Sequence, residues 1–71
     1  MILTNDTSAT GLRSVRTALG ISQAELARRL KLHPSLVSRV ERGRVESWPK
    51  FRRDAAEALG VPEAVLFRPE R

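Results

Sequence analysis

The chain has 71 residues, of which 41% are hydrophobic and 4% aromatic, so it holds one small domain with an aliphatic core and is too apolar for a disordered tail. It has no cysteine, which excludes disulfides, thiolate metal sites and thiol catalysis. Basic residues outnumber acidic ones by 13 to 8, for a net charge of +5. This balance favours a polyanionic partner, nucleic acid ahead of an anionic membrane surface.

No apolar run approaches the roughly 20 residues that span a bilayer, and residues 1–10 lack the basic and apolar regions of a signal peptide. We therefore expect a cytoplasmic protein, associated with the nucleoid if it binds DNA. His33 is the only histidine, and the sequence has no paired carboxylates, nucleophile–base set or glycine-rich phosphate loop. We expect neither an enzyme nor a bound metal or cofactor.

Residues 1–8 are a polar lead-in that we interpret as a flexible N-terminal arm. The first helix is expected over residues 9–19, with Gly20 at its C-terminal cap. Gly11 weakens its first turn by up to about 1 kcal/mol relative to alanine. Apolar residues recur three or four positions apart along this helix and form one stripe: Leu12, Val15 and Leu19.

The second helix has the clearest start signal. Ser22 is followed three residues later by Glu25, the spacing of a capping box, and a helix over residues 23–30 follows. The third helix begins at Pro34, because proline suits the first helical position, and continues to Arg42.

A fourth helix is expected from about Trp48 to Leu59, and a short fifth one from Pro62 to Phe67. Residues 68–71 form a short tail. No stretch alternates between apolar and polar residues with a period of two, so we expect no sheet. Trp48 and the apolar residues near Phe67 either complete the core or form a dimer contact.

The third helix has two unlike faces. At 100° per residue, its polar residues share one arc, and its apolar residues Leu36, Val37 and Val40 lie opposite. Small hydroxyl side chains let a helix approach base edges, and an arginine fork can bridge two guanine acceptors. A solvated charged face that binds nothing fits this helix alone equally well. The polar arc consists of Ser35, Ser38, Arg39 and Arg42.

The second and third helices, joined by the short turn 31–33, form a helix-turn-helix over residues 22–42, the length of the DNA-binding version. Basic residues outnumber acidic ones between Arg39 and Arg53, so much of the excess charge lies in or beside this element. That placement favours DNA contact over a uniformly charged surface. Arg52 and Arg53 themselves either face solvent or lie along the DNA backbone.

The run GISQAELARRLKLHPSLVSRVERGR resembles the phage-repressor and Cro-type helix-turn-helix family, the xenobiotic-response-element regulators of bacteria and phages. The resemblance covers about residues 9–67 and implies an all-α fold, a compact five-helix lambda-repressor-like domain with a central helix-turn-helix. Four segments carry it: SQAELA at 22–27, VSRVERG at 37–43, AEALGV at 56–61 and VPEAVLF at 61–67.

The resemblance also implies roles for individual residues. The base-facing positions are Ser35, Ser38 and Arg39. The positions that usually meet phosphate are Ser22, Gln23, Arg42 and Arg44, and the Gln23 position can also brace a base-contacting side chain. Arg16 and Glu41 resemble a structural arginine–glutamate pair that links the first and third helices.

Three residues depart from the family pattern. Pro34 stands where the family often has a glutamine that can pair with adenine, so base reading must shift to other residues. His33 replaces the usual serine or threonine cap of the third helix and is expected to cap it less well. Lys31 replaces the usual turn glycine, which adds either strain or another phosphate contact.

The expected function is sequence-specific binding of double-stranded DNA by a transcriptional regulator, of repressor type, that reads the major groove with residues 34–42. Because one such module contacts few base pairs, we expect a homodimer on an inverted repeat, with half-sites about 34 Å apart. The alternative is an antitoxin-like or accessory module that mainly binds a partner protein. Membrane-surface binding is disfavoured, because the core needs all the apolar stripes.

Overall fold

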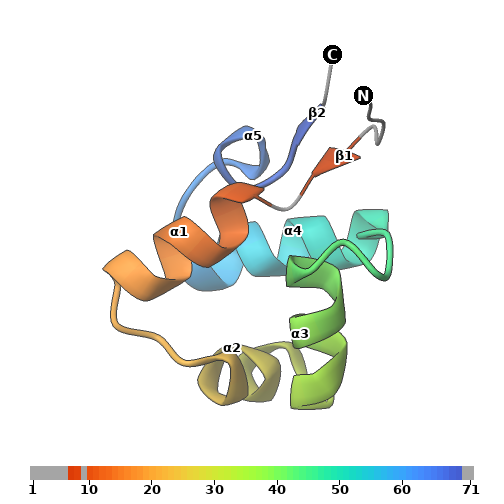
Figure 1. Cartoon of the computed structure of the whole chain (residues 1–71). Coiled ribbons are helices and arrows are strands. Elements are labelled where there is room, and N and C mark those ends of the chain that lie inside the picture. The colour runs from red at the N-terminus through yellow and green to blue at the C-terminus, as the bar shows by residue number, and fades with distance from the viewer. Residues whose placement is uncertain (1–6, 9, 70–71) are drawn as a thin grey trace.

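The computed structural model describes residues 7–8 and 10–69 (Figure 1). Each predicted helix is present, with ends close to those expected, and the predicted all-α class is confirmed. The described residues form five helices, α1 (Thr10–Ala18), α2 (Gln23–Leu30), α3 (Pro34–Glu41), α4 (Pro49–Leu59) and α5 (Glu63–Leu66).

One short strand pair was not expected. Strand β1 (Thr7–Ser8) runs antiparallel to β2 (Arg68–Pro69) near α5 (Figure 1). The expectation of no sheet is therefore wrong here, and residues 7–8 and 68–69 are paired rather than parts of a loose arm and tail. Two-residue strands are too short for an alternating pattern to reveal. Residues 1–6 of the predicted arm lie outside the described part of the chain.

The core draws a fully buried side chain from every helix. In Figure 1, α1 and α5 pack together at one end of the molecule, α2 and α3 lie at the other, and α4 runs behind them. Burial of these aliphatic and aromatic side chains is the main force that holds the helices together. The largest are Leu12, Leu26, Val37, Val40, Phe51 and Leu66.

The aromatic residues belong to this core. The ring of Phe51 lies 5.1 Å from that of half-buried Trp48 and 6.0 Å from that of Phe67, measured between ring centroids. Leu66 and Phe67 are buried, whereas Val65 is 43% exposed. The core interpretation is therefore confirmed for Trp48, Leu66 and Phe67.

The turn between α2 and α3 places Lys31 in the left-handed region, at φ 60° and ψ 42°. This conformation costs an ordinary residue about 1–2 kcal/mol, whereas glycine adopts it freely but loses more chain entropy on folding. We expect Lys31→Gly to raise the free energy of unfolding by about 0.5–1 kcal/mol, measured by urea denaturation. Lys31→Ala is the control, since it removes the same side chain and keeps the strain. A glycine variant no more stable than the alanine variant would contradict this account.

Candidate nucleic-acid interface

Helix α3 is anchored by one face and exposed by the other. Val37 and Val40 are 0% and 1% exposed, which fixes the rotation of the helix about its axis. Ser35 and Arg39 lie on its exposed side, as does Arg42 directly after the helix. Ser38 is half-buried, so it lies at the edge of the predicted arc rather than at its centre.

The N-terminal end of α3 is capped by His33. The His33 ring atom Nδ1 accepts a hydrogen bond from the backbone N–H of Ser35, 3.1 Å away. It also lies 2.9 Å from the hydroxyl oxygen of the same serine. His33 therefore caps the helix with a side-chain acceptor in the position where serine or threonine is usual. The expectation that histidine caps less well than these residues did not take this hydrogen bond into account.

The backbone folds back over the C-terminal end of α3. The N–H of Arg42 donates to the Ser38 carbonyl at 3.0 Å, and the N–H of Arg44 donates to the Arg39 carbonyl at 2.9 Å. Gly43 allows this turn because it adopts a φ of 77°. The exposed arginines at positions 39, 42 and 44 are thus held together around one helix end.

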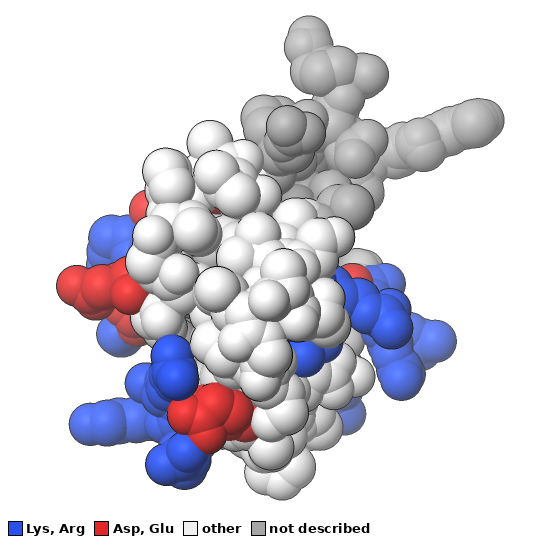
Figure 2. All heavy atoms as spheres, turned by 90° about the vertical axis from the view of Figure 1, so that its left-hand side faces the viewer, with Lys and Arg blue, Asp and Glu red and all other residues white. Residues whose placement is uncertain are grey.

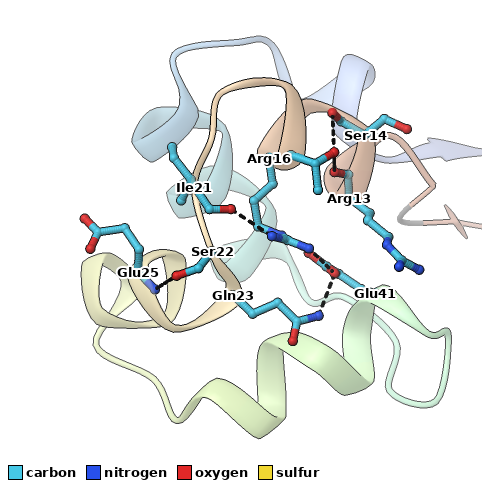
Figure 3. A network of polar contacts seen from close by, with 9 residues as sticks. Arg13, Ser14, Arg16, Ile21, Ser22, Gln23, Glu25 and Glu41 are labelled. Carbon is cyan, nitrogen blue, oxygen red and sulfur yellow. Dashed lines mark hydrogen bonds and ion pairs between the residues drawn. The ribbon is translucent and has the colours of Figure 1, made fainter.

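A buried polar network joins α3 to the rest of the fold (Figure 3). Arg16 on α1 makes two bonds to Glu41 on α3, from Nε to Oε2 at 2.6 Å and from Nη2 to Oε1 at 3.1 Å. Its Nη1 also donates to the carbonyl of Ile21 at 2.7 Å. The side chains of Arg16 and Glu41 are 8% and 2% exposed, so this pair sets the position of α3 relative to α1 from within the protein.

The side chain of Gln23 also belongs to this network. Its Nε2 donates to Glu41 Oε1 at 2.8 Å (Figure 3). The predicted phosphate-contacting amide is therefore half-buried and directed at Glu41. Only its second N–H and its carbonyl oxygen remain for another partner.

Ser22 forms the N-terminal cap of α2, because its hydroxyl oxygen accepts the N–H of Glu25 at 3.0 Å. The carboxylate of Glu25 does not return this bond and instead binds Arg28 and, at 3.0 Å, Arg29. Hydrogen bonds from Arg28 and Arg29 hold the pKa of the Glu25 carboxyl below its usual value. The capping box is thus half formed, and both arginines are engaged with an acid on their own helix.

The basic side chains in the described part of the chain fall into two groups, those with a polar partner and those without one. Lys50 is paired with Asp54 at 2.7 Å, and Arg52 donates to the Ser47 carbonyl at 2.6 Å. Figure 2 shows Lys and Arg gathered at two margins of one side of the molecule, with an uncharged face between them. Within residues 11–67, the exposed basic side chains with no hydrogen bond or ion pair to another described residue are those of Arg13, Lys31, Arg39, Arg42, Arg44 and Arg53.

Arg13 belongs to this group of exposed basic side chains and lies near α3, and the sequence did not single it out. It lies one helical turn before Arg16, whose side chain points to Glu41 at the end of α3. Figure 3 shows the Arg13 guanidinium directed toward that same end. The signal was its spacing of three residues from Arg16, which becomes informative only when Arg16 is placed against α3.

Within the described residues, no group of three His, Asp or Glu side chains could hold a metal ion. An open cleft between α2 and α4 is lined by residues of both charges, including Lys31, Lys50, Asp54 and Glu57. No helix in the described part is long and apolar enough to cross a bilayer.

The fold and this site define a helix-turn-helix domain, with α2 and α3 as its two helices and an exposed basic face on the second. The chain belongs to the helix-turn-helix domain family, which matches residues 9–67. The predicted resemblance to helix-turn-helix regulators is therefore confirmed.

Solved structures support this assignment. The clp gene regulator ClgR from Corynebacterium glutamicum is 33% identical over 82% of this chain and 75% of its own, with a TM-score of 0.77. The hypothetical transcription factor NHTF from Neisseria is 39% identical over 86% of this chain and 70% of its own, with a TM-score of 0.78.

The same fold occurs within an enzyme. Hydroxypropylphosphonic acid epoxidase from S. wedmorenis is 27% identical over 87% of this chain, with a TM-score of 0.75, but the match covers only 35% of the epoxidase. No curated protein matches the chain. Family and fold therefore support a DNA-binding regulator, and the roles of single residues must be argued from the site.

Proposed function

We propose that this protein is a sequence-specific transcriptional regulator, of repressor type, that places α3 in the major groove of double-stranded DNA. The observation that carries this proposal is the exposed basic face of α3. Arg39 and Arg42 are exposed there without an acidic partner among the described residues, while Val37 and Val40 anchor the opposite face. Leaving several cations unpaired around one helix end is understandable if a polyanion neutralises them.

The base contacts are assigned to Ser35, Ser38 and Arg39. Arg39 reaches furthest, and its planar fork matches the O6 and N7 acceptors of guanine. Ser35 is small and exposed in the first turn of α3, where the backbone can approach a base edge. Half-buried Ser38 has a shorter reach and contributes at the edge of the contact.

The phosphate contacts are assigned to two groups of residues. Arg42, Arg44 and Arg13 supply positive charge around the C-terminal end of α3. Ser22 and Gln23 lie at the N-terminal end of α2, where the first backbone N–H groups have no partner within the helix and the helix dipole favours an anion. These contacts supply most of the affinity and make it sensitive to salt.

Arg39→Ala and Arg44→Ala should affect binding differently. The reference duplex is the DNA site that the wild type selects from a random library. We expect Arg39→Ala to weaken binding to this selected site by about 1–3 kcal/mol, and to weaken binding to a scrambled duplex less, because it removes a base contact. Arg44→Ala should weaken both about equally and lower the salt slope by about one, because it removes a phosphate contact. Fluorescence anisotropy titrations at several salt concentrations measure both effects.

The matched control is Arg28→Ala, which also removes an exposed arginine but from the Glu25 pair on α2. It should leave both affinities unchanged. The assignment of Arg39 fails if Arg39→Ala reduces binding to the two duplexes equally. DNA binding by this face fails if neither Arg39→Ala nor Arg44→Ala differs from the wild type.

A homodimer on an inverted repeat is part of the proposal, because a single helix as short as α3 spans only a few base pairs. A cytoplasmic location and the absence of catalysis are expected for such a regulator. Analytical ultracentrifugation of the protein with its selected duplex, compared with a half-site duplex, measures the number of chains bound. Binding of only one chain to the full duplex would contradict the proposed homodimer.

Binding of a partner protein is the second candidate function. Leu19 is 53% exposed and Val65 is 43% exposed, and the buried centre of a protein interface is more apolar than the rest of a protein surface. Three results together would favour this function over DNA binding. A stoichiometric partner co-purifies with the chain, Leu19→Ser abolishes its binding, and the chain selects no DNA.

A further inference from the structure

The cap of α3 ties a base-facing serine to a histidine. Nδ1 of His33 accepts from the backbone N–H of Ser35 at 3.1 Å and lies 2.9 Å from its hydroxyl oxygen. Both residues are exposed, and between them stands Pro34, which has no polar side-chain atom. Ser35 is therefore the first side chain of α3 that can hydrogen-bond to a base edge.

The two contacts determine where the protons lie. An imidazole nitrogen that accepts from an N–H carries no proton itself, so the ring proton of the neutral histidine is on Nε2. The 2.9 Å contact between Nδ1 and the Ser35 hydroxyl can then be a hydrogen bond only with a hydrogen from the hydroxyl, and the two donors share the one lone pair of Nδ1. Ser35 thus donates its only hydroxyl proton to His33, and its oxygen has only lone pairs to offer to another molecule.

We propose that Ser35 reads DNA as a hydrogen-bond acceptor only, and that its partner is an exocyclic amino group in the major groove, N6 of adenine or N4 of cytosine. This inference rests on the proposed function. A free serine is ambiguous, because its hydroxyl can rotate to donate or accept and so tolerates several bases. His33 is the positioning residue that removes this ambiguity.

The same arrangement disfavours guanine and thymine. At the corresponding positions these bases present the acceptors O6 and O4. Two lone-pair surfaces facing each other leave both acceptors without a donor, a mismatch that costs binding free energy. The pair therefore turns an adaptable contact into a selective one, at the helix position where proline cannot pair with adenine.

The test begins with selection of duplexes from a random library by the wild type and by three variants. We expect the wild type to prefer one orientation of a base pair, with adenine or cytosine on the strand that Ser35 faces, over the reverse orientation by about 3- to 10-fold, the range of one hydrogen bond, and Ser35→Ala to lose this preference. His33→Ala frees the hydroxyl and should broaden the preference to include guanine and thymine. His33→Asn should keep it, because the asparagine side-chain oxygen can take the place of Nδ1 as acceptor.

A second measurement removes the amino group from the DNA. In the selected duplex, the adenine or cytosine at this position is replaced by purine or 2-pyrimidinone, which lack it. We expect the replacement to weaken binding of the wild type about 3- to 10-fold more than that of Ser35→Ala. Ser35→Ala retains the backbone N–H that His33 caps, so this comparison does not depend on how well His33→Ala folds.

The possible outcomes are distinct. Because every base pair carries one amino group in the major groove, the overturning result comes from removing that group. If its removal from either strand at the position sensitive to Ser35 weakens the wild type no more than Ser35→Ala, or if His33→Ala keeps the wild-type preference, the inference fails and DNA binding stays in place. A selected site without any position sensitive to Ser35 has the same consequence. If the wild type enriches no sequence at all, the proposed function fails, and the inference fails with it.

Discussion

Glu41→Ala is expected to lower the free energy of unfolding by about 3–5 kcal/mol, because it leaves the guanidinium of Arg16 buried without its carboxylate. Arg16 is 8% exposed and keeps only its bond to the Ile21 carbonyl. Domains are stable by about 0.05–0.15 kcal/mol per residue, so a chain of 71 residues would lose much of its stability. Urea denaturation followed by circular dichroism measures the change.

Two further variants separate the buried pair from charge removal in general. Glu46→Ala removes an exposed carboxylate and should change stability by less than about 0.5 kcal/mol. The double variant Arg16→Met with Glu41→Leu should recover part of the loss, because an apolar pair needs no charge compensation, although the Ile21 carbonyl and the Gln23 amide then lose their partners. Equal effects of Glu41→Ala and Glu46→Ala would show that the network does not hold α3 in place.

Gly11→Ala is expected to destabilise the fold by about 3 kcal/mol, the upper end of the usual cost of overpacking. A Cβ atom at this position would lie 2.0 Å from the carbonyl oxygen of Val65 and 3.1 Å from Cα of Leu66. The obstacle is the backbone of α5, which cannot rotate aside as a side chain can, so α1 and α5 would have to separate. A thermal melt of the two proteins compares their stability.

Helix propensity alone makes the opposite prediction for Gly11→Ala, a gain of up to about 1 kcal/mol. Ser14→Ala is the control, since Ser14 is exposed on the same helix and alanine should there raise stability slightly. If Gly11→Ala is as stable as the wild type, α1 and α5 do not pack as closely as the structure has them. The sequence-based interpretation, that Gly11 only weakens the first turn of α1, would then be enough to describe this position.

The exposed face of α3 and its neighbours show which features could be foreseen from the sequence. The rotation of α3 was predictable, because Val37 and Val40 mark the buried side and the spacing of the serines and arginines follows from 100° per residue. The partner of Glu41 was expected only through the family resemblance. That Gln23 would share the same carboxylate, and that Arg13 would lie near the same helix end, depends on how α1, α2 and α3 pack.

The sequence by itself determined the helices, their caps and the faces of α3, because these depend on residues within one or two turns of each other. Tertiary structure alone decided that Gly11 meets the backbone of α5, that Thr7–Ser8 pairs with Arg68–Pro69, and which cations remain unpaired near α3. Each of these features depends on distances between atoms of a few ångströms, and a one-dimensional pattern of residue types does not contain them.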